Sequence, residues 1–315
     1  MRRFLLTRIG LALITLVLVS IMVFAVSQLL PGDVGRTILG PYATNAQVAS
    51  LDHELGVDKP LLVRYKNWIV GFVQGDWGQS ALLNQPVRPV VLHRLANSLM
   101  LGGFALVLIV PFSILMGVLA ALHYGKTVDR LISVTGLSLI ALPEFVAGVI
   151  LLVLFAVKVQ WFPVSSSVPK ANPVDWFRQF LLPSIPLMLV LFGYISRMAR
   201  AGTVDALLSN YTRTAVLKGL PRRTVIWRHV LRNALLPTIS VVSVQVGYLV
   251  GGLVVIETLF NYPGIGKLTL DSAIGHDLQV LESTVLMIAV LYMVTNLVAD
   301  VLYGILNPRV RLASS

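Results

Sequence analysis

The chain alternates between long apolar stretches and shorter polar segments, and six of the apolar stretches are long enough to cross a lipid bilayer as helices. The hydrocarbon core of a bilayer is about 30 Å thick and a helix rises about 1.5 Å per residue, so a span needs about 20 mostly apolar residues. The six stretches cover residues 9–30, 97–122, 131–157, 180–196, 235–256 and 281–306. The pattern predicts an all-α, polytopic membrane protein with six transmembrane helices.

The first stretch also resembles a secretion signal, because Arg2 and Arg3 precede it and Ala25-Val26-Ser27 resembles a processing site. The apolar region of a signal peptide is about 7–15 residues long. The stretch from 9 to 30 exceeds this length and suits a membrane span. We therefore expect the first helix to be retained.

Composition supports the membrane prediction, since hydrophobic residues make up 56% of the 315 residues and charged residues only 12%. A chain this poor in charge cannot build an ordinary water-exposed surface, so lipid must cover much of it. The net charge of +11 does not indicate nucleic acid, because the basic residues are spread among apolar stretches. Cysteine is absent and the five histidines lack the spacing of metal ligands, so we expect neither disulfides nor a metal site.

The basic residues also predict orientation. With six spans, most of the 25 basic residues fall in the segments on the side of the N-terminus, and the longer segments on the other side hold fewer basic residues and many of the acids. The positive-inside rule then places both termini in the cytoplasm. The predicted organisation is a cytoplasmic N-terminus and first helix at 1–30, a periplasmic segment at 31–96 and a five-helix core at 97–315.

Two polar segments carry a pattern of their own. In the outer one, a helix is predicted to place six apolar residues on one face, and the sequence Gly75-Asp76-Trp77-Gly78 predicts a turn after it. The six residues are Leu61, Leu62, Tyr65, Trp68, Ile69 and Phe72. We expect this helix to lie on the outer membrane surface or to pack over the spans.

The inner segment, residues 197–234, predicts a helix, a sharp break and a second helix. Apolar residues recur at helical spacing from Val204 to Ala215, Gly219-Leu220-Pro221 interrupts them, and the period resumes at Val225. Eight basic residues accompany the single acid Asp205. This imbalance suits either anionic lipid headgroups or a soluble partner.

Several motifs resemble those of the permeases of binding-protein-dependent ABC importers, in particular the dipeptide/oligopeptide branch and its B-type subunit. Residues 211–220 and 229–237 are similar to the cytoplasmic EAA loop of that family. Similar short motifs follow one another along the whole chain: Leu30-Pro31-Gly32-Asp33, Gly75-Asp76-Trp77-Gly78-Gln79-Ser80, Trp161-Phe162-Pro163-Val164, Leu182-Pro183 and Asn261-Tyr262-Pro263-Gly264-Ile265-Gly266-Lys267. Each motif alone is weak evidence for the resemblance, but the order and spacing of the motifs together are specific to this family.

The resemblance implies a type I ABC importer permease fold with a periplasmic insertion after the first helix. It implies a subunit of the bacterial inner membrane that forms half of the translocation path for peptides or similar small solutes. The partners it implies are a second homologous permease, two ABC ATPases, a periplasmic substrate-binding protein and membrane lipid. The chain itself would be no enzyme and would bind no cofactor, since ATP and magnesium would act at the partner ATPases.

The resemblance also implies that the loop at about 197–236 couples the permease to its ATPase. The coupling residues carried over are Asp205, Tyr211, Arg213, Thr214, Ala215, Lys218 and Gly219. Gly219 would allow the tight reversal, and Ala215 would allow close approach of the partner backbone. Arg213 and Thr214 stand where the general importer motif begins with an acidic residue, so an acidic contact to the ATPase is not carried over. The other interpretation of Gly219 is that it only ends a surface helix.

No motif for catalysis is present. Gly264-Ile265-Gly266-Lys267-Leu268 superficially suggests a phosphate loop, but Asn261 replaces the first glycine and Leu268 replaces the Ser or Thr that holds magnesium. ATP must therefore be handled by another chain.

Polar residues within the spans are candidates for the substrate path, because a charge at mid-bilayer costs several kcal/mol unless it is paired or hydrated. Glu144, beside Pro143, could present a carboxylate to a cationic substrate group, or it could form an internal ion pair or hydrogen bond. Gln245 is a weaker candidate, and Asp300 is expected to pair near the membrane boundary. An alternative function is a stand-alone secondary transporter or channel, in which Glu144 and Asp300 would bind coupling ions. Such a protein would not need the inner helix–break–helix segment.

Overall fold

The computed structural model describes residues 2–29, 36, 39–40, 42–55, 59–169 and 172–306. The predicted Leu30-Pro31-Gly32-Asp33 motif lies outside the described residues. The secondary-structure elements of the described part are all helices: α1 (Arg2–Leu29), α3 (Asn45–Leu55), α4 (Leu61–Gln74), α5 (Val87–Leu122), α6 (Thr127–Ala141), α7 (Glu144–Leu151), the π-helix η1 (Leu152–Lys158), α8 (Pro173–Leu208), α9 (Asn210–Leu217), α10 (Arg222–Thr224), the π-helix η2 (Val225–Val230), α11 (Leu231–Leu259), α12 (Ile265–Ile274) and α13 (Leu278–Leu306). The all-α class predicted from the sequence is confirmed.

Five of the predicted spans are long apolar helices, namely α1, α5, α8, α11 and α13. The third predicted span is not continuous, because α6 and the helix formed by α7 and η1 meet at an angle of 97°. The bend lies at Leu142 and Pro143, where Leu142 is extended with ψ 117°. A residue before proline is forced out of the helical region, which explains the break. The described residues therefore contain six candidate spans if this bent pair counts as one crossing.

Several spans begin earlier than the hydrophobic pattern predicted, as α5 and α8 illustrate. Helix α5 starts at Val87, so the predicted boundary between residues 96 and 97 falls inside a helix. Helix α8 starts at Pro173, and the Asn172 side chain accepts a hydrogen bond from the Val174 N–H at 3.0 Å. Pro183 and Pro186 therefore lie inside α8 and not at its start. The polar first turns of these helices hid their true starts from an analysis of apolar stretches.

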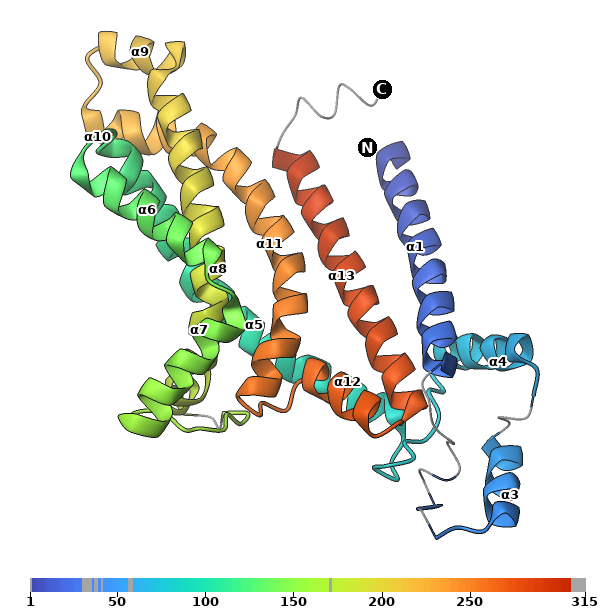
Figure 1. Cartoon of the computed structure of the whole chain (residues 1–315). Coiled ribbons are helices and arrows are strands. Elements are labelled where there is room, and N and C mark those ends of the chain that lie inside the picture. Colours follow the sequence, from blue (N-terminus) through green and yellow to red (C-terminus); the bar gives the residue numbers. More distant parts are fainter. Residues whose placement is uncertain are drawn as a thin grey trace.

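The centre of the fold is a packed group formed by α5, α8 and α11, with α6 against α8 (Figure 1). Phe180 is fully buried there, and its ring makes edge-to-face contacts with Trp176 and Tyr262 at centroid distances of 5.2 and 5.7 Å. A side chain at Gly117 would clash with the Ser196 carbonyl of α8. Small residues of this kind let membrane helices approach closely, so packing replaces the hydrophobic effect as the stabilising force.

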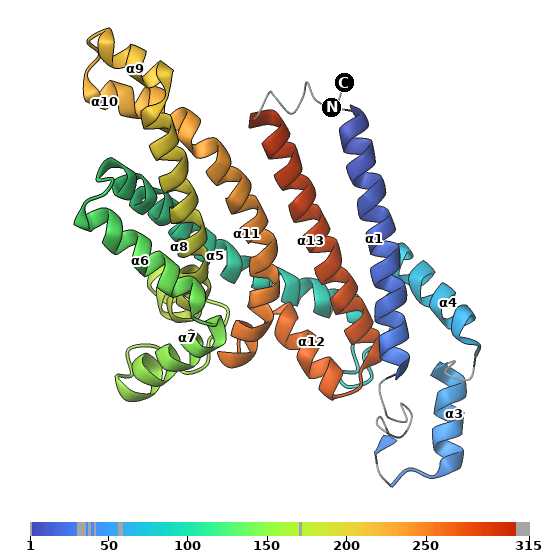
Figure 2. The same ribbon diagram turned by 45° about the horizontal axis from the view of Figure 1, so that its top comes forward.

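Helix α1 lies at one edge of this group and packs on α13 and α4, as both ribbon views show (Figures 1 and 2). Two polar contacts join α1 to α13. Arg8 pairs with Asp300 at 3.2 Å near one end, as expected for Asp300. Near the other end, the Ser27 hydroxyl donates to Glu282 Oε1 at 2.5 Å. Most of the remaining α1 surface is exposed and apolar, which suits contact with lipid.

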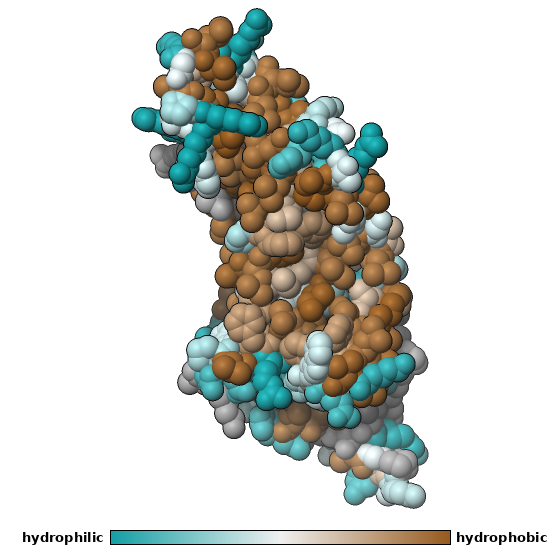
Figure 3. Space-filling view, turned by 90° about the vertical axis from the view of Figure 1, so that its left-hand side faces the viewer, coloured by the Kyte–Doolittle hydropathy of each residue, from teal (hydrophilic) through white to brown (hydrophobic). Residues whose placement is uncertain are grey.

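The face of the molecule seen in Figure 3 carries a broad apolar region between two polar ends. Helices α9 and α10 project at the end where α1 begins, and α3, α4 and α12 lie at the opposite end (Figure 1). This distribution matches a protein whose middle is surrounded by lipid.

Helix α4 uses part of its predicted apolar face. Its aromatic residues form a chain of ring contacts that runs from Phe24 of α1 to Trp77 in the following turn. Leu61 and Leu62 do not join this contact and are exposed. The turn after α4 forms as predicted, because Gly75 and Gly78 adopt positive φ angles of 88° and 78°.

Candidate functional site

The predicted coupling loop, residues 197–236, covers the end of α8, the projecting unit of α9, α10 and η2, and the start of α11. The helix predicted to run from Val204 to Ala215 is interrupted at Ser209, whose ψ of 152° is extended. The hydroxyls of Ser209 and Thr212 both donate to the Ala206 carbonyl, at 2.6 and 2.7 Å, and so satisfy the end of α8. Serine and threonine commonly compete with helix hydrogen bonds in this way, and α9 therefore starts as a separate helix.

Gly219 ends α9 in a left-handed conformation with φ 73°. Its N–H donates to the Val216 carbonyl at 2.9 Å, and the Leu220 N–H donates to the Ala215 carbonyl at 3.3 Å. This pair of hydrogen bonds is a Schellman motif, which requires a positive φ at the glycine position. Pro221 follows and prevents the helix from continuing. The sharp reversal between α9 and α10 therefore depends on Gly219.

The predicted coupling residues divide into two groups. Six of them have exposed side chains or, at Gly219, an exposed backbone: Asp205, Tyr211, Arg213, Thr214, Lys218 and Gly219. Leu217 lies beside them with 80% of its surface exposed, although it is apolar. Exposed apolar residues within a basic surface are typical of a protein contact, because anionic lipid headgroups would require only the charges.

Ala215 differs from the other six. Its side chain is buried among Ala206, Val225, Val230 and Ala234 of the same chain. The small side chain therefore lets α9 pack against α8 and η2, instead of leaving space for a partner backbone. The helical period of the sequence showed that Ala215 lies on an apolar face, but could not show what covers that face.

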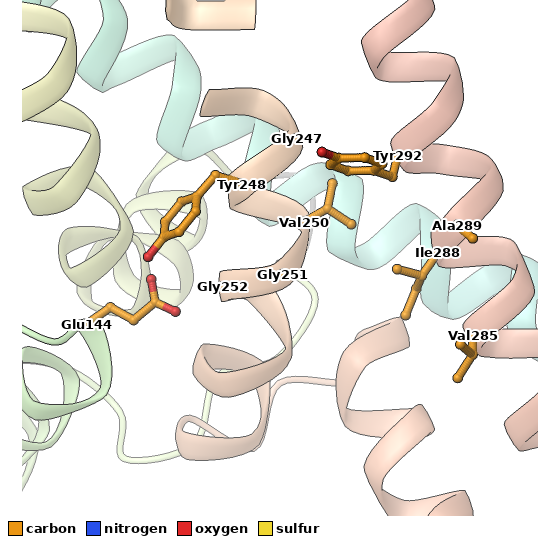
Figure 4. A pocket seen from close by; sticks show the side chains of 10 residues that line it. All are labelled: Glu144, Gly247, Tyr248, Val250, Gly251, Gly252, Val285, Ile288, Ala289 and Tyr292. Atoms are coloured by element: carbon orange, nitrogen blue, oxygen red, sulfur yellow. The ribbon is translucent and has the colours of Figure 1, made fainter. Parts of the chain in front are cut away.

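A second candidate site is an open groove across α11, with a volume of about 530 Å³. Glu144 of α7 lies at one side and Tyr292 of α13 at the other, with Gly251 and Gly252 of α11 between them (Figure 4). The Tyr248 hydroxyl points toward the Glu144 carboxylate (Figure 4). The sequence pattern indicated Glu144 but not the two tyrosines, whose only signal was their position within apolar spans.

The helix break places Glu144 in this groove. Because Pro143 ends α6, Glu144 becomes the first residue of α7 and its carboxylate reaches the surface of α11. A side chain at Gly252 would begin only 2.9 Å from Glu144 Oε2, so the glycine makes room for the carboxylate. Oε2 is buried and has no hydrogen-bond partner among the described residues. Among these residues, no basic side chain forms an ion pair with Glu144.

Gln245, the other predicted residue of the substrate path, does not line this groove. It is 8% exposed, and its side-chain nitrogen Nε2 is buried without a hydrogen-bond partner in the described part of the chain. Gln245 precedes Gly252 by two turns of α11 and so lies on the same side of that helix, but outside the lining of the groove.

The glycine-rich turn before α12 has a structural role that the sequence analysis missed. Glu257 is fully buried, and its carboxylate accepts hydrogen bonds from the Ser98 hydroxyl and from the N–H groups of Gly266 and Lys267. The carboxylate therefore occupies the N-terminus of α12, where a helix favours negative charge. This turn holds the chain's own carboxylate.

A partly buried ion pair joins α6 to α8 near the projecting unit. Arg200 donates from Nε and Nη2 to the two carboxylate oxygens of Asp129, at 2.5 and 2.7 Å. The guanidinium also lies 5.3 Å from the centre of the Tyr124 ring. Across the described residues, no group of three or more His, Cys, Asp or Glu side chains is arranged to hold a metal ion.

Comparison with known proteins identifies the family. Residues 113–312 match the family "Binding-protein-dependent transport system inner membrane component", and residues 1–94 match its N-terminal companion. The chain is 32% identical to a probable peptide ABC transporter permease protein, y4tP of Sinorhizobium fredii, over 98% of this chain and 99% of that protein. It is 35% identical to the glutathione transport system permease proteins GsiC of Salmonella typhimurium and of Escherichia coli K12, over 94% of this chain and 95% of each relative.

These relatives support the importer function and not the alternative of a stand-alone transporter or channel. Permeases of this family act in the membrane together with an ATPase and a binding protein. The chain belongs to the binding-protein-dependent transport system inner membrane component family and is a transmembrane permease subunit of an ABC importer.

Proposed function

We propose that this permease forms half of the translocation path of a peptide importer and that a second, homologous permease forms the other half. The incomplete path supports this proposal: the α11 groove is open on one side and carries a carboxylate atom without a partner among the described residues. A charged group within the membrane costs several kcal/mol when it faces lipid, so we expect a protein or water to complete the groove.

The proposed coupling element is the projecting unit of α9, α10 and η2. It lies at the same end of the molecule as the start of α1, so the positive-inside prediction for the N-terminus also applies to it (Figure 1). We place this end in the cytoplasm, where α9 would dock on one of two ATPases that bind ATP and magnesium. ATP-driven closure of the ATPases would move α9, and the rigid helices α8 and α11 would transmit this movement to the path.

The substrate class rests on the relatives, which are named as permeases for peptides and for glutathione, itself a small peptide. The observation that carries the proposal is similarity over nearly the whole chain to both. We therefore propose short peptides, delivered by a periplasmic binding protein, as the substrates.

Stimulated ATP hydrolysis by the purified complex tests the substrate class. The complex, with its cognate binding protein, would be offered dipeptides, tripeptides, glutathione, a monosaccharide and a nickel chelate. Peptides should stimulate hydrolysis and the other solutes should not. Stimulation by the sugar or the chelate alone would refute the peptide assignment while leaving the importer function intact.

A further inference from the structure

We propose that the α11 groove is a transit site for a primary ammonium group of the transported solute, with the Glu144 carboxylate as its counter-charge. This inference rests on the proposed function, since it assigns a substrate group to the translocation path. Its basis is an unpartnered acidic atom that points into a groove otherwise lined by apolar and aromatic side chains.

The carboxylate has the chemistry of a cation site and not of a structural ion pair. Oε2 of Glu144 is buried, lacks a hydrogen-bond partner in the described part of the chain and meets no basic side chain there. The buried carboxylates with a structural role have partners within the chain: Glu257 accepts three hydrogen bonds and Asp129 pairs with Arg200. An ammonium group, with its three donors, would supply the hydrogen-bond partner that Oε2 of Glu144 lacks.

The shape of the groove also suits a small cationic group. Gly251 and Gly252 leave the surface of α11 without side chains beside the carboxylate, so a ligand can approach the helix backbone. Tyr248 and Tyr292 lie on either side of this glycine surface (Figure 4). Aromatic rings attract ammonium groups through their faces, which adds to the attraction of the carboxylate.

A metal ion or a lipid fits the groove less well. One carboxylate flanked by phenol rings offers too few oxygen ligands for Ca²⁺ or Mg²⁺. Lipid acyl chains would leave the carboxylate unsolvated, at a cost of several kcal/mol. A peptide can bring its ammonium group to Glu144 and place its apolar side chains on the walls at Val285 and Ile288.

Thiol labelling of the complete importer in lipid nanodiscs tests this inference without measuring transport. Because the chain lacks cysteine, Gly251→Cys supplies a single thiol in this chain, and a side chain there meets nothing within 4 Å. Cysteines of the partner subunits would be replaced or blocked. The rates of reaction with a cationic trimethylammonium-ethyl and an anionic sulfonatoethyl methanethiosulfonate would be compared.

The cationic reagent should react faster, and Glu144→Gln should reduce the cation-to-anion rate ratio by about fivefold or more. Glu144→Asp keeps the charge and should keep most of the ratio, while Asp271→Asn, which removes an acid outside the groove, should leave it unchanged. Alanyl-alanine should protect the thiol, and N-acetyl-alanyl-alanine should not.

Three results would overturn the inference: a rate ratio that does not depend on Glu144, equal protection by both peptides, or a thiol that reacts with neither reagent because lipid or protein covers it. Each of them would leave the peptide-stimulated ATP hydrolysis of the preceding section untouched. The two proposals can therefore fail separately.

Discussion

Replacement of Gly219 by a residue with a side chain should disturb the coupling loop through backbone strain alone. The residue holds φ at 73°, and a Cβ placed there meets no atom within 4 Å. The substitution therefore creates no clash inside the chain. The left-handed conformation costs an L-residue about 1–2 kcal/mol, and a β-branched residue is the least tolerant of it.

A strain of this size reduces the population of the native loop by about 5- to 30-fold relative to a rearranged loop, since 1.4 kcal/mol corresponds to a factor of ten. Gly219→Ala should lose part of the substrate-stimulated ATP hydrolysis, and Gly219→Val should lose more. Gly219→Asn is the matched control, because asparagine has a side chain of similar size to valine but enters the left-handed region more readily.

The assay is ATP hydrolysis by the purified complex, with expression in the membrane measured alongside. Insertion should survive in all three variants, because Gly219 lies outside the apolar spans. Stimulation should decrease in the order Gly, Asn, Ala, Val. Equal loss for Asn and Val would show that the bulk of the side chain, and not the backbone angle, is what the loop cannot accept. Full stimulation in Gly219→Val would refute the role of this turn in coupling.

Asp129→Ala should lower the stability of the detergent-solubilised protein by about 1–3 kcal/mol, because it removes a bidentate hydrogen-bonded partner from Arg200, whose side chain is only partly buried. Lys267→Ala, in an exposed pair, should cost about 1 kcal/mol or less, and equal losses in thermal unfolding would contradict this difference. Glu257→Ala should also destabilise the protein, by about 1–3 kcal/mol for each donor left unpaired, and unchanged proteolysis of the segment around α12 would refute its capping role. Ser50→Cys should react with an impermeant reagent outside intact cells and Leu217→Cys should not; reaction of both would refute the proposed orientation.

The sequence predicted the spans well because the thickness of the bilayer imposes their length and apolar character. It did not predict the bend of 97° at Pro143, since an apolar stretch interrupted by proline has the same composition whether it is kinked or folded back. The starts of α5 and α8 were missed for a related reason: their first turns lie among polar residues outside the apolar stretches.

In the candidate sites, the sequence likewise predicted the local role of some residues but not the contacts of others. Gly219 was predicted correctly as a point of reversal, because glycine followed by proline indicates a helix end in any context. The surroundings of Ala215 were not predictable, because helical spacing reveals an apolar face but not its partner. The role of Glu257 depends on contacts with α5 and α12, which only the folded chain brings together.

Reconstitution in proteoliposomes tests whether this chain transports only as a subunit of an ATP-driven importer. Vesicles would contain this permease with its homologous partner and the ATPases, and the binding protein would be loaded with a labelled peptide. Peptide uptake should require ATP, the ATPases and the binding protein together, and this chain alone should give no uptake. Uptake by the chain alone, without ATP, would contradict the account and favour a stand-alone transporter.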